Sequence, residues 1–141
     1  MRHFVREIVT TVKRIHDTTG RQVPLVGWSL GGVVSREVAR QVPELIEQVI
    51  TLGSPVIRSG QRMTNVAVLV TAIYTKADGI VPWKSSIDRV DPNVDHVEVR
   101  STHLGLGVHH AVFVEIAQRL HSARRRRDAA GSTADASVSR P

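Results

Sequence analysis

Hydrophobic residues follow one another at helical spacing in three segments of the chain. The first segment predicts an amphipathic helix that ends at Gly20, with an apolar stripe made of Phe4, Ile8, Val12 and Ile15. The second predicts a helix from Gly31 to about Gln41, which stops before Pro43 because a proline disfavours a helical residue in front of it. The third predicts a closing helix over 111–121.

The segments between these helices are apolar and rich in β-branched residues, as buried strands are. They comprise residues 23–28, 46–52, 66–74 and 94–100. Because strands that alternate with helices form parallel βαβ units, the sequence predicts an α/β fold with a parallel sheet flanked by helices. In such a sheet the functional site lies beyond the carboxyl ends of the strands.

The composition is that of one globular domain with a basic end. The chain has 141 residues, of which 41% are hydrophobic, and a formal net charge of +6. It has no cysteine, which excludes disulfides and thiolate metal sites. The four arginines at 124–127 precede a segment rich in Ala, Ser, Thr and Gly. We therefore expect a folded domain over 1–122 and a disordered basic tail over 123–141, and no nucleic-acid partner.

The sequence carries no pattern that is typical of membrane insertion or secretion. No apolar run approaches the roughly 20 residues that a membrane span needs. The first residues lead into an amphipathic segment rather than into the apolar core of a signal peptide. These features predict no transmembrane segment and a cytoplasmic location.

The turn between the first strand and the second helix reads G-x-S-x-G, with Ser29 at its centre. This pattern is typical of a nucleophile elbow, a sharp strand-to-helix turn that exposes a serine. We expect Gly27 and Gly31, which lack a Cβ, to let the strand and the helix approach closely. The free N–H groups at the start of the helix would face a developing anion. The alternative interpretation is a glycine-rich turn with a surface serine.

A serine nucleophile needs a base, and the base needs an acceptor that fixes its tautomer. Asp78 directly follows the third predicted strand, and no acidic residue lies between Glu47 and Asp78. Of the seven histidines, His103 alone lies in a glycine-rich loop directly after the fourth strand. Ser29, Asp78 and His103 are therefore predicted at one edge of the sheet, although Asp78 could equally cap its own loop as an Asx turn.

Clustered histidines can also hold zinc, here His103, His109 and His110 with a carboxylate. Adjacent histidines on a helix point about 100° apart, however, and no H-E-x-x-H pattern is present. We expect neither a metal nor a cofactor.

Four motifs, in this order, resemble bacterial α/β-hydrolases of the triacylglycerol lipase and esterase type. They are Val-Gly-Trp-Ser-Leu-Gly-Gly at 26–32, Thr-Leu-Gly-Ser-Pro at 51–55, Thr-Lys-Ala-Asp-Gly-Ile-Val-Pro at 75–82 and Ser-Thr-His-Leu-Gly-Leu-Gly at 101–107. The resemblance covers about residues 1–122. It implies Ser29 as nucleophile, Asp78 as the acid and His103 as the base, with the N–H of Leu30 as an oxyanion donor. It also implies the C-terminal half of the hydrolase fold, because the family's first four strands have no counterpart here.

The resemblance further implies a serine hydrolase that cleaves small-molecule or lipid esters through an acyl-enzyme. Trp28 and Trp83 could line its pocket, or equally serve as half-buried packing residues. Thirteen residues, 53–65, are too few for a helical cap, which would leave the site open. The alternative function is a weakly active or inactive hydrolase-like fragment that acts as an interaction module. In either case the strand at 23–28 would lie at an open sheet edge, where it could pair with another chain.

Overall fold

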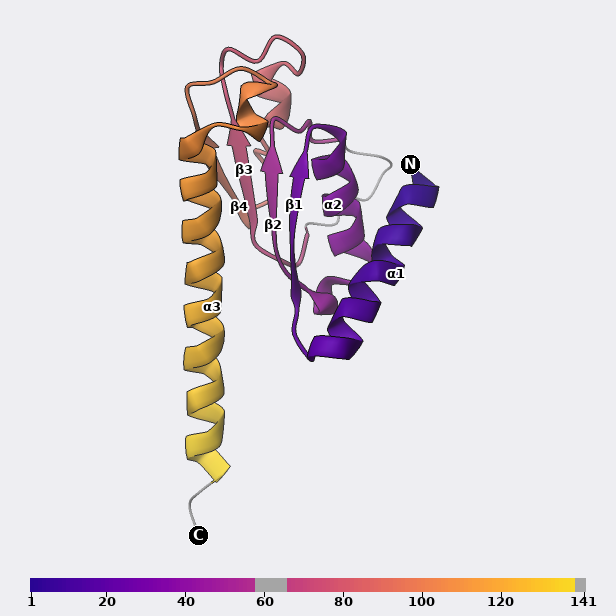
Figure 1. Ribbon diagram of the computed structural model, residues 1–141, viewed down its shortest axis with the longest axis vertical. Coiled ribbons are helices and arrows are strands. Elements are labelled where there is room, and N and C mark those ends of the chain that lie inside the picture. The colour runs from indigo at the N-terminus through magenta and orange to yellow at the C-terminus, as the bar shows by residue number, and fades with distance from the viewer. Residues whose placement is uncertain (58–65, 139–141) are drawn as a thin grey trace.

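The computed structural model describes residues 1–57 and 66–138, and of residues 130–138 the backbone alone. The helices and strands, in chain order, are α1 (Arg2–Thr19), β1 (Val23–Trp28), α2 (Leu30–Gln41), β2 (Ile46–Leu52), β3 (Val70–Tyr74), β4 (Val94–Glu98) and α3 (His110–Val138). Short 3₁₀ turns separate some of them, namely η1 (Pro43–Leu45), η2 (Trp83–Ser86) and η3 (Gly105–Gly107). Helices α1 and α2 cover one face of the sheet and α3 lies on the other (Figure 1).

The four strands form one parallel sheet in the order β1-β2-β3-β4. The register places Trp28 beside Leu52 and Leu52 beside Ile73, so the carboxyl ends of the strands share one edge. This arrangement confirms the predicted α/β fold with a parallel sheet between helices. Within the part of the chain that the structure describes, β1 pairs on one side alone, as we expected of the elbow strand.

The core between α1, α2 and the sheet is built from valines and isoleucines. Helix α2 buries Val34 and Val38, and α1 buries Val5 and Val12. The predicted stripe of α1 was partly wrong, because Phe4 remains 58% exposed at its outer margin. The stripe is centred instead on the line from Val5 to Val12, which are seven residues apart and so lie on one side of a helix.

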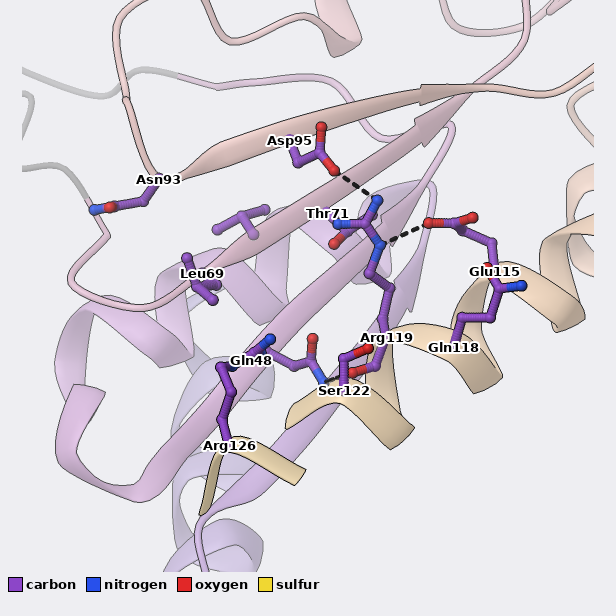
Figure 2. A pocket seen from close by; sticks show the side chains of 11 residues that line it. Gln48, Leu69, Thr71, Asn93, Asp95, Glu115, Gln118, Arg119, Ser122 and Arg126 are labelled. Carbon is purple, nitrogen blue, oxygen red and sulfur yellow. Dashed lines mark hydrogen bonds and ion pairs between the residues drawn. The ribbon is translucent and has the colours of Figure 1, made fainter. Parts of the chain in front are cut away.

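On the other face, α3 is fixed to the sheet by polar contacts as well as by its apolar core. Gln48 of β2 donates a hydrogen bond from Nε2 to the carbonyl of Arg119, 3.1 Å away. The Arg119 guanidinium lies 2.5 Å from Asp95 of β4 and 2.6 Å from Glu115 of its own helix (Figure 2). These groups line a pocket of about 420 Å³ near the amino-terminal ends of β3 and β4. The pocket therefore lies at the opposite end of the sheet from the predicted site.

The third strand is shorter than the apolar run that predicted it. Strand β3 begins at Val70 and not at residue 66. Val66 is buried in the α1–α2 core, but its N–H donates to Asp91 Oδ2 at 2.9 Å instead of joining the sheet. Burial in a loop thus produced an apolar pattern that resembles a strand. Most of the connection at 53–65, which we expected to be a loop too short for a cap, lies outside the described residues.

Helix α3 continues as far as Val138, so residues 123–138, which the sequence predicted to be part of a disordered tail, are helical in the structure. Arginine and alanine, which are frequent in this segment, are good helix formers. Ala123 is buried, and Arg127 lies 2.5 Å from Glu47 of β2, so this part of α3 contacts the body. The domain boundary proposed at residue 122 falls inside the helix, while 139–141 lie outside the described residues.

None of the helices in the described part of the chain combines the length and the apolar character that crossing a membrane requires.

Candidate active site

The turn between β1 and α2 has the sharp geometry of an elbow. Ser29 lies between the two elements with φ 52° and ψ −120°, and among the described non-glycine residues it alone has a positive φ. Such a conformation costs about 1–3 kcal/mol and persists where surrounding contacts hold it. One of these contacts is the hydrogen bond that Ser29 N–H donates to Leu52 O of β2, at 2.8 Å. The backbone therefore presents Ser29 at the carboxyl edge of the sheet.

The sequence predicted that Gly27 and Gly31 allow the close approach of the strand and the helix. The structure confirms Gly27 but shows that Gly32, and not Gly31, is the second glycine at the contact. A Cβ on Gly27 would lie 2.4 Å from Gly31 O, and a Cβ on Gly32 would lie 2.7 Å from Ser54 Cβ. A Cβ on Gly31 would meet nothing within 4 Å. Gly31 projects from the exposed side of α2, whereas Gly32 faces the sheet and is buried.

Asp78 and His103 form a buried pair beside this turn. His103 Nδ1 lies 2.7 Å from Asp78 Oδ2, and the two side chains are 6% and 2% exposed. An ionised carboxylate can only accept hydrogen bonds, so Nδ1 carries the proton that is shared with Asp78. In the neutral imidazole Nε2 is then left as an acceptor, which is the form that a general base needs.

The second oxygen of Asp78 holds the loop that follows β3. Oδ1 accepts hydrogen bonds from the N–H groups of Ile80, at 2.9 Å, and Val81, at 2.7 Å. Burial acts to raise the pKa of Asp78, but the hydrogen bonds from His103, Val81 and Ile80 outweigh it, so the pKa lies below its ordinary value of 3.8. The two roles considered for Asp78 therefore coexist: one oxygen caps the loop and the other binds the histidine.

Ser29 and His103 lie at the same end of the sheet. Trp28, the neighbour of Ser29, donates a hydrogen bond from Nε1 to the His103 carbonyl at 3.1 Å, and the rings of Trp28 and His103 are 5.7 Å apart. Gly53 follows β2, whose Leu52 binds Ser29, and a Cβ on Gly53 would lie 3.1 Å from His103 Nδ1. The hydrogen bonds of the described residues include the Asp78–His103 contact but none between Ser29 and His103.

Two further residues shape the site, and the candidate list drawn from the sequence missed both. Gly53 has φ +52°, and a Cβ there would lie 3.0 Å from Asp78 Oδ2. Thr75 is buried at the end of β3, where its hydroxyl donates to Ser101 O at 2.7 Å and accepts from Ser101 N–H at 3.2 Å. A glycine directly after a predicted strand could have indicated the first, but no sequence signal indicated the second.

The remaining candidates occupy different surroundings. Leu30 is the first residue of α2, where backbone N–H groups have no partner inside the helix. Trp83 stacks on Tyr74, with ring centroids 5.9 Å apart, and Lys76 Nζ lies 5.7 Å from the centroid of the Trp83 ring. None of these contacts is with Ser29, Asp78 or His103. His109 stacks on His110, with ring centroids 4.7 Å apart, and among the described residues neither histidine is hydrogen-bonded to Asp78.

Solved structures with a similar fold include α/β-hydrolases. An α/β-hydrolase enzyme from the metagenome of sediments of the Mar Chica lagoon superposes with a TM-score of 0.64 and 20% identity, over 88% of this chain and 71% of its own. A putative lipase from Acinetobacter baumannii gives 0.67 and 11%, over 86% and 69%. The monoacylglycerol lipase of Paleococcus ferrophilus gives 0.59 and 13%, over 84% and 74%. At these identities the likeness shows the fold.

Sequence comparison leads to one family. No curated protein matches the chain significantly. A family model described as the PGAP1-like alpha/beta domain matches residues 1–118, which is most of the chain. That range includes the elbow at Ser29 and the Asp78–His103 pair, and the fold agrees with it. The chain belongs to the family of PGAP1-like α/β domains.

Proposed function

We propose that this chain is a serine hydrolase that cleaves carboxylic esters through an acyl-enzyme on Ser29. The observation that carries the proposal is the buried hydrogen bond between Asp78 and His103, next to a serine held at φ 52°. A buried acid that orients a histidine beside a partly exposed serine is the arrangement that activates a hydroxyl for attack. The two lipases with a similar fold support this class of reaction.

In the proposed mechanism His103 Nε2 takes the proton of Ser29 as the Oγ attacks the ester carbonyl carbon. The tetrahedral intermediate collapses with cleavage of the carbon–oxygen bond, and the leaving alkoxide receives the proton from His103. A water molecule, deprotonated by His103, then attacks the acyl carbon. The bond between that carbon and Ser29 Oγ breaks and His103 returns its proton to Oγ, which releases the carboxylic acid and free Ser29. Asp78 keeps the imidazole in the required tautomer and stabilises its positive charge.

The backbone N–H of Leu30 is the proposed oxyanion donor, because it lies at the start of α2 directly after the nucleophile. No second donor is assigned within the described residues. A single donor of this kind contributes roughly 10²–10³ in rate. We therefore expect measurable but modest turnover from this chain.

Exposed apolar side chains directly flank the three proposed catalytic residues. Leu30 is 55% exposed, Ile80 64% and Leu104 65%, and each is one or two residues away from Ser29, Asp78 or His103. Apolar surface that gathers at a site favours apolar ligands. We propose an ester with an apolar acyl group, small or lipid-like.

The proposal is tested by hydrolysis of a short-chain nitrophenyl ester. Ser29→Ala and His103→Gln should each lower kcat by at least about 10³, as loss of a triad member does in other serine hydrolases. The matched control is His109→Gln, because His109 stacks on His110 and takes no part in the Asp78–His103 pair. Equal activity of wild type and Ser29→Ala would refute the mechanism.

The alternative, an interaction module without catalysis, predicts a different result. A folded wild-type chain, checked by circular dichroism, would hydrolyse no ester at any acyl length. The exposed edge of β1 would then be the first surface to test for partners, since Val26 on it is 48% exposed.

A further inference from the structure

Trp28 makes contacts that a wall of a substrate pocket does not need. It is the last residue of the edge strand β1 and is covalently adjacent to Ser29. Its indole N–H donates to the backbone carbonyl of His103 at 3.1 Å, across 75 residues of sequence. Its ring also lies 5.7 Å from the imidazole ring of His103, with 33° between the two planes.

The same indole packs on the loop that carries the histidine. A Cβ added to Gly107, in the 3₁₀ turn η3, would lie 3.7–3.8 Å from three carbons of the Trp28 ring, which is ordinary van der Waals contact. The indole therefore lies beside both His103 and Gly107 of this loop. With 42% of the residue exposed, Trp28 is partly covered and partly open to solvent.

The rest of the histidine loop is fixed from the opposite side. Thr75, at the end of β3, exchanges two hydrogen bonds with Ser101, and Leu106 is completely buried in the core under α3. Asp78 binds the imidazole itself and also follows β3. These contacts place His103 relative to Asp78, but none of them involves the strand that carries the nucleophile. The hydrogen bond from Trp28 supplies that connection.

We propose that Trp28 is a positioning residue that sets the place of His103 relative to Ser29. The inference rests on the proposed function, because it assigns Trp28 a role in the same site. Since Trp28 and Ser29 are consecutive, a displacement of the nucleophile relative to the histidine loop must break the Nε1 hydrogen bond or move the loop with it. The indole thus couples the two parts of the site that the Asp78–His103 pair does not join.

The test is a comparison of Trp28→Phe with wild type in the hydrolysis of nitrophenyl esters of increasing acyl length. Phenylalanine keeps an aromatic face over the loop but has no N–H to donate. Loss of one neutral hydrogen bond predicts a kcat lowered roughly threefold to tenfold, with KM unchanged at every acyl length. Trp28→Ala, which also removes the ring, should lower kcat further. A KM that changes with acyl length while kcat of Trp28→Phe stays at the wild-type value would overturn the proposal and favour a pocket wall.

A second readout does not require activity. The Nδ1 proton of His103, held between the imidazole and Asp78, should be visible by proton NMR, and in Trp28→Phe its exchange with water should be faster by a similar factor. Trp83→Phe is the matched control, because its indole stacks on Tyr74 and it should leave that exchange rate unchanged. If the wild type proves inactive, the proposed function fails, yet this NMR comparison still decides the role of Trp28. Equal exchange rates in wild type and Trp28→Phe would contradict it.

Discussion

Replacement of Gly32 by alanine tests the packing of the elbow, because the structure makes this glycine and not its neighbour the point of contact. A Cβ on Gly32 would lie 2.1 Å from Ser54 Oγ, 2.7 Å from Ser54 Cβ and 3.0 Å from Gly27 O. Ser54 is 2% exposed and lies directly after Gly53, so it has little room to retreat. At Gly31, one position earlier in the same helix, the added methyl group would meet nothing within 4 Å.

The magnitude follows from three terms. Overpacking of a tight interior costs about 1–3 kcal/mol. Rotation of the Ser54 hydroxyl away from Leu52 O, its acceptor at 3.2 Å, would leave a buried polar group unpaired, at a further cost of about 1–3 kcal/mol. The higher helix propensity of alanine offsets up to about 1 kcal/mol of this. We therefore expect Gly32→Ala to lower the free energy of unfolding by about 2–4 kcal/mol. Gly31→Ala should change it by at most about 0.5 kcal/mol.

The assay is urea unfolding of both variants, monitored by circular dichroism. The stabilities are compared on the condition that the dependence of the unfolding free energy on urea concentration is the same in both. A second site provides an internal check, because Ser54→Gly removes both atoms that the new methyl group would strike. In the Ser54→Gly background, Gly32→Ala should cost at least about 1 kcal/mol less than in the wild type, as contacting residues are not additive. Equal stability of Gly31→Ala and Gly32→Ala would refute the packing assigned to the elbow.

Other predictions concern the acid, a buried ion pair and the sheet edge. Asp78→Asn should lower kcat of ester hydrolysis by about 10³–10⁴, because the amide no longer fixes the histidine tautomer. Because the pKa of Asp78 is lowered in the folded chain, ionised Asp78 stabilises the fold fully above about pH 3.8, and this stabilisation is lost as the pH falls through the lower pKa of the folded state. A titration of the Asp78 carboxyl by carbon NMR with a midpoint above 3.8 would contradict this. Arg36→Met should lower the free energy of unfolding, measured in urea, by about 3 kcal/mol, because Arg36 lies 3.5 Å from Asp88 and both side chains are at most 9% exposed. An unchanged midpoint of urea unfolding would argue against a buried ion pair. We also expect self-association through β1, so that Val26→Lys lowers the mean mass in sedimentation equilibrium, whereas equal masses would exclude this edge.

The sequence was most informative where local pattern and fold agree. Strands β1 and β2 and the helix α2 appear at or within one residue of their predicted bounds, because each is a short apolar or amphipathic segment closed by Gly, Ser or Pro. From the predicted carboxyl ends of all four strands, the common location of Ser29, Asp78 and His103 at one edge of the sheet could be inferred. The Asp78–His103 hydrogen bond agrees with that inference.

Features that depend on packing could not be read in this way. Periodicity does not distinguish Gly31 from Gly32, since only the position of Ser54 decides which of them is crowded. The apolar character of Val66 reflects a buried loop, which is indistinguishable from a strand in a single sequence. The arginines of α3 were interpreted from composition, whereas Arg127 reaches Glu47 on β2, eighty residues away along the chain.

The central claim, that Ser29 is an activated nucleophile, is tested most directly by covalent labelling. The folded chain is treated with a fluorophosphonate and digested, and the labelled peptide is identified by mass spectrometry. The proposed mechanism predicts a single adduct on Ser29, absent in Ser29→Ala and formed at least about 10³ times more slowly in His103→Gln, which lacks the base. An unlabelled wild-type chain that is folded, or an adduct on another serine with Ser29 unmodified, would contradict it.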